Sequence, residues 1–421
     1  MRKPVGIQHL SNAPLPMPVW EFVGMVACMI ALNALAIDVM LPALGVIGEH
    51  FELQNPNHQQ FILYAYIAGF GAPQLIFGPI SDRFGRKGLL NICLIGYAAM
   101  GVLCMIAPSF TLLLVARFVH GVFSSGVRVI GVSIVRDLMA GRAMARIMSL
   151  VMTVFMIVPI IAPAIGQGIM TFADWHWTFG VTAIGAIGLI IWAHIRLPET
   201  LPEDHRQDLK FSRVMKSFWS VLSTRVTCGY MVASGVIFGS LFSFIAASEQ
   251  IFDVVFGRGD QFALWFAIIA GALAVSNFAN SKIVEAIGMR RISHTVLFVF
   301  ITMSAATALT MSIVGPNLYV FLPMFCIVFG CFGMMGANFS ALAMEAQGNI
   351  AGTASAVYGF FTTTVAAGFG WIVSSQFNGS VVPMMIGFVG LGLLSLFIIT
   401  YTEKGKLFGI GEGKEDETVN V

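Results

Sequence analysis

Long apolar runs separated by short polar segments recur along almost the whole chain. Each run is about 18 to 25 residues long, enough for a helix to cross the roughly 30 Å of hydrocarbon in a bilayer. The pattern predicts spans near residues 20–47, 58–81, 88–107, 110–135, 146–170 and 177–195, followed by 226–250, 261–284, 292–313, 317–343, 351–374 and 382–401. We therefore predict an all-α membrane protein with about twelve transmembrane helices.

The longest polar segment, 196–225, separates two groups of spans and predicts two halves. The predicted order is a lead (1–19), a first half (20–195), a linker (196–225), a second half (226–402) and a tail (403–421). Within the linker, residues 209–222 are typical of an amphipathic helix on the membrane surface. A weak repeat links 78–87 with 281–290, each with an acid, a glycine three residues later and then a basic residue. Two parallel six-helix halves, with the substrate site between them, are one architecture of alternating-access transporters.

Composition excludes an ordinary soluble protein, because 57% of the 421 residues are hydrophobic and only 10% are charged, against roughly 25% in soluble domains. The basic residues predict the orientation. Of the 23 Lys and Arg residues, Arg117 and Arg128 lie inside a span. Arg258 alone falls in a segment on one side of the membrane, and the other 20 fall in segments on the opposite side. By the positive-inside rule that side is the cytoplasm, with both termini in it. We expect a protein of the inner (plasma) membrane.

The same features limit the partners and the chemistry. The net charge is only +2, and the basic residues serve as anchors at the membrane edge, so no nucleic acid is expected. No nucleotide-binding loop, zinc-protease motif or nucleophile elbow is present, so we expect neither an enzyme nor an ATP-driven pump. A channel is disfavoured because no filter-like repeat is present. The expected partners are the bilayer and small hydrophobic compounds, and we expect a monomer without a cofactor.

The segment GPISDRFGRKG, residues 78–88, is the most specific motif. Its glycines allow a tight turn between helices, and Arg86 is predicted to form an ion pair with Asp137 at the end of a neighbouring span. We predict that the motif gates a conformational change. An alternative for its other basic residues is anchoring at the membrane edge. The predicted gating residues are Gly78, Asp82, Arg83, Gly85, Arg86, Lys87 and Asp137.

Three spans carry further motifs. The fourth contains Arg117-Phe-Val-His120-Gly121. The fifth contains Pro159, Pro163 and Gly166, where prolines deform a helix and small residues allow close helix packing. The first contains Ile37-Asp38-Val-Met-Leu-Pro-Ala-Leu44.

Together these motifs resemble those of the major facilitator superfamily. The loop resembles its G-x-x-x-D-R-x-G-R-K signature, and the fourth and fifth spans resemble its R-x-x-Q-G and antiporter motifs. The first span is similar to that of Bcr/CflA-type drug:proton antiporters, whose members export chloramphenicol-like, bicyclomycin-like and other amphiphilic compounds. The sequence departs from that subfamily at His120, where Gln is usual, and at Arg128, where small residues are common.

Charges inside a span are costly, roughly 2.5–3.5 kcal/mol on insertion scales, and so indicate function. Asp38 and Arg117 are predicted to lie at similar depth. We predict that Asp38 binds the coupling proton, because burial favours its neutral form and a nearby guanidinium favours its charged form. Arg117 is predicted to tune Asp38 or to bind substrate. A purely structural ion pair is the alternative. Arg128 shares a helix face with Arg117 and Ser124, although it could instead extend toward the cytoplasmic side.

The predicted substrate-binding set combines these charges with aromatic side chains that would suit varied hydrophobic ligands. It consists of Asp38, Arg117, His120, Ser124, Arg128, Tyr66, Phe70, Phe238 and Phe242. For His120, hydrogen-bonded packing remains an alternative. Glu249 is expected at a solvated rim near the outer surface.

The resulting hypothesis is a secondary multidrug exporter that exchanges small hydrophobic or amphiphilic compounds for protons, the proton being the only coupling ion. The alternative is a proton-coupled transporter of one metabolite class, such as a sugar, peptide or siderophore. Few polar residues lie in the spans, which disfavours a sugar carrier.

Overall fold

The structure is a computed structural model of the 421-residue chain, and it describes residues 17–139, 141–206, 218–345, 347 and 351–409. Within these ranges the regular structure is helical, as the apolar pattern predicts. The described chain has 11 helices long and apolar enough to cross a membrane, or up to 12 if one bent pair is a single span. The all-α membrane fold is therefore confirmed.

The chain divides into two compact units. Unit 1 comprises 1–52 and 61–211, and unit 2 comprises 53–60 and 212–421. The predicted linker, 196–225, includes 207–217, which lie outside the described residues. The amphipathic helix predicted over 209–222 falls mostly on that segment, and its described part, 218–222, is helical.

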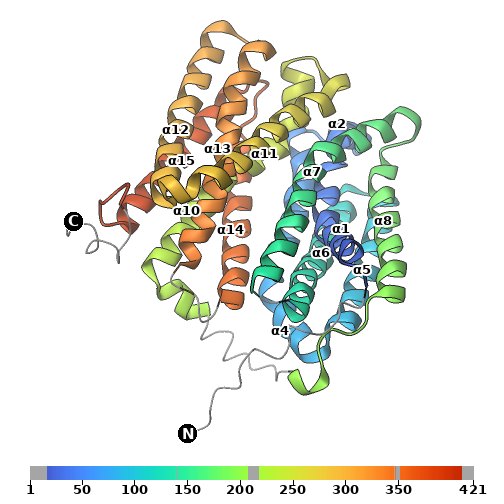
Figure 1. The fold of residues 1–421 in the computed structure, drawn as a ribbon. Coiled ribbons are helices and arrows are strands. Elements are labelled where there is room, and N and C mark those ends of the chain that lie inside the picture. Colours follow the sequence, from blue (N-terminus) through green and yellow to red (C-terminus); the bar gives the residue numbers. More distant parts are fainter. Residues whose placement is uncertain (1–16, 140, 207–217, 346, 348–350, 410–421) are drawn as a thin grey trace, which may run out of the picture. The chain divides into compact units, whose positions relative to one another are not determined.

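Unit 1 is a bundle in which α6 lies against α3, α4, α5 and α1, while α7 packs on α1 and α8 packs on α5 (Figure 1). Its helices are α1 (Val19–Asp38), α2 (Leu44–His50), α3 (Phe61–Gly71), α4 (Gln74–Phe84), α5 (Arg86–Met105), α6 (Phe110–Leu138), α7 (Gly141–Phe172) and α8 (His176–Arg196). At the start of α1, Glu21 forms an ion pair with Arg196 at the end of α8, with 2.7 Å between oxygen and nitrogen.

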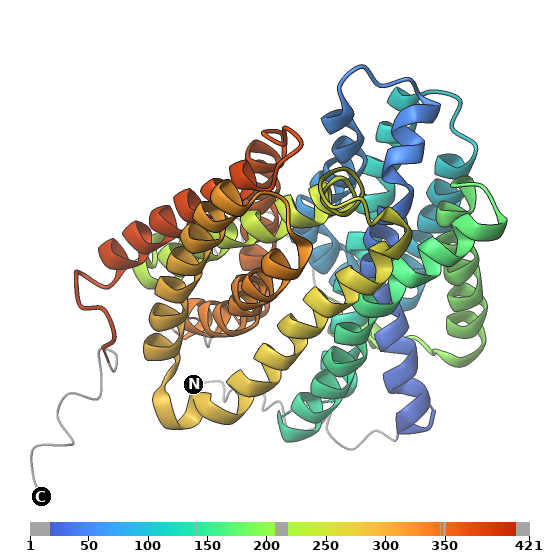
Figure 2. The same ribbon diagram turned by 90° about the horizontal axis from the view of Figure 1, so that it is seen from above.

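Unit 2 is a second bundle, in which α10 contacts α13, α14 and α15, and α12 lies beside α13 and α15 (Figure 2). Its helices are α10 (Arg225–Gln250), α11 (Phe262–Ile287), α12 (Met289–Val314), α13 (Leu318–Met344), α14 (Ala351–Ser374) and α15 (Val382–Thr402). Its core is rich in packed phenylalanines; the rings of Phe244 and Phe325, for example, are tilted toward each other with centroids 4.7 Å apart.

Two predicted spans are not single straight helices. The first is interrupted, because α1 ends at Asp38 and a short 3₁₀ turn at Leu41–Ala43 precedes α2. Pro42 explains the break: a proline has no N–H to donate, and its ring clashes with the carbonyl four residues earlier, here that of Asp38. The second, predicted as 58–81, is a helix pair bent by 44° between Gly71 and Gln74, where Pro73 also lacks an N–H donor.

Candidate functional site

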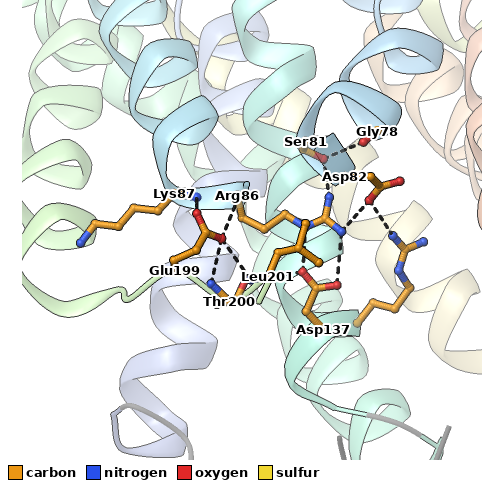
Figure 3. A network of polar contacts seen from close by, with 10 residues as sticks. Gly78, Ser81, Asp82, Arg86, Lys87, Asp137, Glu199, Thr200 and Leu201 are labelled. Atoms are coloured by element: carbon orange, nitrogen blue, oxygen red, sulfur yellow. Dashed lines mark hydrogen bonds and ion pairs between the residues drawn. The ribbon is translucent and has the colours of Figure 1, made fainter. Parts of the chain in front are cut away.

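The loop signature is centred on Arg86, at the start of α5 and only 2% exposed. Its guanidinium lies 2.7 Å from Asp137 at the end of α6 and 2.7 Å from Asp82 in α4 (Figure 3). It also donates to the hydroxyl of Ser81, which itself donates to the carbonyl of Gly78 at 2.8 Å. The ion pair between Arg86 and Asp137 predicted from the sequence is thus present. Because Arg86 is buried and joins three helices, it links their ends firmly.

The remaining basic residues of the motif lie around this centre. Lys87 donates to the carbonyl of His194 at 3.0 Å, so it does more than anchor the chain at a membrane edge. Arg83 is exposed, with its guanidinium 5.7 Å from the ring of Phe84. Asp82 is also 4.0 Å from Arg136, a residue that the sequence analysis did not select.

Glu199 is a second residue of this network that sequence reasoning missed. One carboxylate oxygen accepts the backbone N–H of Arg86 at 2.9 Å, and the other accepts that of Lys87 at 3.1 Å (Figure 3). These two N–H groups begin α5 and lack partners within the helix, and the positive end of the helix dipole favours a carboxylate there. No local pattern in the linker identifies this role, because the partner lies more than 100 residues away.

Gly85, between α4 and α5, explains why the motif has glycine at this position. Its φ of +93° and ψ of 162° are a conformation that residues with a Cβ rarely adopt. A Cβ here would also lie 2.6 Å from Oε2 of Glu199. The glycine therefore permits both the turn and the approach of the carboxylate.

Unit 2 repeats this arrangement at the start of α12. Gly288 has φ +91° and ψ 144°, close to the values of Gly85. Arg290 lies 3.0 Å from Glu345, after α13, and 2.9 Å from Glu403, after α15. Glu285, the acid of the sequence repeat, forms no ion pair with any described residue. The repeat thus predicts the glycine and arginine, whereas the acids come from other helices.

Asp38 is the last residue of α1 and is 4% exposed. Within the described part of the chain, its carboxyl makes no hydrogen bond or ion pair. A buried, unpaired carboxylate is costly, and the C-terminal end of a helix dipole also disfavours negative charge. Both effects favour the protonated side chain, so this position is suited to binding a proton.

Arg117 is fully buried and does not pair with Asp38 in the described structure, contrary to the ion-pair alternative. It donates to the carbonyl of Ala36 at 3.0 Å and to that of Ile62 at 3.2 Å. The carbonyl of Ala36 is one of those left without a helical partner where α1 ends, and a cation at a helix C-terminus is stabilising. Arg117 therefore fixes the backbone two residues before Asp38. Any effect that it has on Asp38 is transmitted through this backbone or across space.

His120 is fully buried and faces Arg117, with 3.4 Å between its Nδ1 and the guanidinium. Its ring packs edge-on against Tyr97, with centroids 4.1 Å apart. Nε2 has no hydrogen-bond partner among the described residues. These contacts match the packing alternative for His120, and its predicted role in substrate binding stays a prediction.

Tyr66 joins α3, on which it lies, to α6. Its hydroxyl lies 2.7 Å from that of Ser124 on α6, and its ring lies beneath the guanidinium of Arg117 at 4.4 Å. The ring of Phe70 stacks on it with centroids 6.4 Å apart, and Arg128 lies 5.6 Å from the Phe70 ring. The predicted residues of spans 2 and 4 thus form one cluster.

The antiporter motif lies in α7, which continues as a helix through Pro159 and Pro163. A Cβ on Gly166 would collide with the carbonyl group of Val39, directly after Asp38. The glycine therefore lets α7 contact the backbone at the end of α1, as small residues do in close helix packing.

The predicted aromatic residues of span 7 belong to unit 2. Phe238 packs on Phe332 with centroids 6.4 Å apart, and Phe242 is half-buried. Their contact with substrate stays a prediction. Glu249 is half-buried and accepts a hydrogen bond from Gln59 at 2.9 Å. Among the described residues, no group of three or more His, Cys, Asp or Glu is placed to hold a metal ion.

The chain is similar to known proteins in sequence and in fold. Residues 26–371 match the model of the Major Facilitator Superfamily. An "Uncharacterized MFS-type transporter YdgK" of Bacillus subtilis is 30% identical over 85% of this chain and 87% of its own length. A "Bicyclomycin resistance protein homolog" of Haemophilus influenzae is 26% identical, with 88% and 93% covered. A "Chloramphenicol resistance protein CraA" of Acinetobacter baumannii is also 26% identical, with 72% and 73% covered.

Among solved structures, a D-xylose-proton symporter superposes with a TM-score of 0.76 at 14% identity, covering 92% of this chain and 99% of that protein. Similarity at this identity concerns the fold only. The motifs, the helical architecture and these matches agree. The chain belongs to the major facilitator superfamily and is a multi-pass membrane transporter.

Proposed function

We propose that this transporter exports small hydrophobic or amphiphilic compounds in exchange for protons, by alternating access. The observation that carries the proposal is the buried carboxyl of Asp38, which has no hydrogen-bond or ion-pair partner among the described residues. A group that binds and releases one proton inside a span is what coupling requires. The relatives named for resistance to bicyclomycin and chloramphenicol support an exporter of drug-like compounds.

Asp38→Asn tests the coupling role. The amide keeps the size of the side chain but cannot exchange a proton, so we expect loss of uptake driven by a pH gradient into inverted vesicles, with substrate binding retained. Glu249→Gln is the matched control, because Glu249 has a hydrogen-bond partner. If Asp38→Asn still concentrates drug against its gradient, Asp38 is not the coupling residue.

The breadth of substrates is tested by proton release from the detergent-solubilised protein. Release on adding several unrelated hydrophobic compounds supports a multidrug exporter. Release by a single metabolite class, such as sugars, contradicts it and favours the single-substrate alternative.

The proposed location is the inner membrane, with both termini cytoplasmic, on the basis of the distribution of Lys and Arg. A cysteine placed at Lys210 tests this orientation in intact cells. A thiol reagent that cannot cross the membrane should leave it unlabelled, whereas labelling would reverse the topology.

A further inference from the structure

Asn33 is a polar residue beside the Tyr66 cluster that has no role in the motifs. It lies on α1, five residues before Asp38, and is half-buried. Its side-chain oxygen lies 3.0 Å from the hydroxyl of Tyr66 and 3.5 Å from that of Ser124. Those two hydroxyls are 2.7 Å apart. Side chains from two other helices, α3 and α6, therefore hold the amide of Asn33.

These contacts orient the amide. Both hydroxyls face Oδ1, an acceptor, so the NH₂ group is directed away from them. Neither N–H of Asn33 has a partner among the described residues. Because Asn33 is only half-buried, this NH₂ group is not enclosed by the protein and can be reached from outside the cluster. The group is therefore ready to donate to an acceptor on a ligand.

The surroundings indicate the chemistry of such a ligand. Tyr66 and Phe70 stack on one another but are almost fully buried, so their rings leave little surface for a ligand, and the amide of Asn33 is the accessible polar group of the cluster. Arg117 is already engaged with two backbone carbonyls. The oriented amide of Asn33 is a neutral donor, which suits an uncharged oxygen acceptor.

We propose that Asn33 is a specificity-determining residue that favours, among hydrophobic substrates, those carrying a neutral oxygen acceptor such as a carbonyl or nitro group. Tyr66 and Ser124 act as positioning residues for its amide. This inference rests on the proposed function, since it assumes that unit 1 binds the exported compound. It adds the chemical group that is recognised.

The test compares two ligands on the full-length protein in detergent, using equilibrium dialysis. Chloramphenicol carries carbonyl and nitro oxygens, whereas tetraphenylphosphonium is an aromatic cation without a hydrogen-bonding atom. Asn33→Leu keeps a similar size but removes the donor. The expected result is about 3–10-fold weaker chloramphenicol binding, as for one neutral hydrogen bond, with tetraphenylphosphonium binding unchanged.

Asn280→Leu is the matched control in unit 2. Asn280 and Asn338 satisfy each other there, at 2.9 Å, so this change should not distinguish the two ligands. Asn33→Ser retains one donor, is less disruptive should the leucine variant misfold, and should give a smaller loss in the same direction.

The outcomes separate the two proposals. If Asn33→Leu and Asn33→Ser weaken the binding of both ligands equally, or of neither, Asn33 does not recognise an oxygen acceptor and the inference is overturned. If the unaltered protein binds neither these two ligands nor other hydrophobic compounds, the proposed drug export fails, and the inference fails with it.

Discussion

The substitution Gly85→Ala adds a single carbon atom, the Cβ, to the turn between α4 and α5. Two costs can be read from the structure. With φ at +93° and ψ at 162°, a residue with a Cβ is strained by about 1–3 kcal/mol. The new Cβ would also lie 2.6 Å from Oε2 of Glu199. Moving that carboxylate sacrifices a charge-assisted hydrogen bond to the backbone, worth about 1.5–3 kcal/mol.

Two other glycines separate these costs. Gly288 has nearly the same backbone conformation, but its Cβ would have no atom within 4 Å, so Gly288→Ala should show the strain only. Gly88, in the first turn of α5, also has no atom within 4 Å of a Cβ, and its φ is not positive. Because alanine favours a helix more than glycine does, Gly88→Ala should be neutral or stabilising by up to about 1 kcal/mol. Gly85→Ala should therefore exceed Gly288→Ala by about 1.5–3 kcal/mol.

The assay is the free energy of unfolding from SDS titration in mixed micelles, together with transport rate and substrate affinity in vesicles. A gating role predicts that Gly85→Ala slows transport while affinity stays nearly unchanged. In a Glu199→Ala background, the excess cost of Gly85→Ala over Gly288→Ala should disappear. Equal costs for the two glycine variants in the unaltered protein would refute the clash with Glu199, and an unchanged transport rate would remove the gating role.

Three further substitutions test other contacts. Arg117→Lys keeps the positive charge but lacks the planar guanidinium that donates to two backbone carbonyls. We therefore expect partial transport, and full uptake driven by a pH gradient would contradict this. Arg290→Met removes the cation from Glu403, which keeps its hydrogen bond from Tyr230, and from Glu345, which is 49% exposed, so it should destabilise unit 2 by about 1–3 kcal/mol. Arg291→Met, at an exposed neighbour, should change SDS unfolding by less than about 0.5 kcal/mol, and similar costs for the two variants would exclude the ion pairs as the cause. Gly166→Ala should abolish transport by forcing α7 away from α1. Gly168→Ala should not, because the space around Gly168 is open. If both variants are active in uptake assays, the contact between α7 and α1 is dispensable.

Local patterns in the sequence were enough to predict the helices and one ion pair. Runs of apolar residues need only a bilayer to become spans, so their number and type follow from length and hydropathy. The Arg86–Asp137 pair was also predictable, because Arg86 begins α5, Asp137 lies near the end of α6, and the short loop between the two helices brings these ends to the same side. The two interrupted spans were missed, although Pro42 and Pro73 carry the signal, because hydropathy does not register a missing N–H donor.

Tertiary structure decided which groups those side chains meet. Arg117 was expected to act on the carboxyl of Asp38, yet it binds the carbonyls of Ala36 and Ile62. Glu199 caps α5 from beyond α8. Neither contact has a sequence pattern, because a backbone carbonyl or N–H is present at almost every position. Only the packing of the helices determines which of these groups lack a helical partner and lie within reach of a charged side chain.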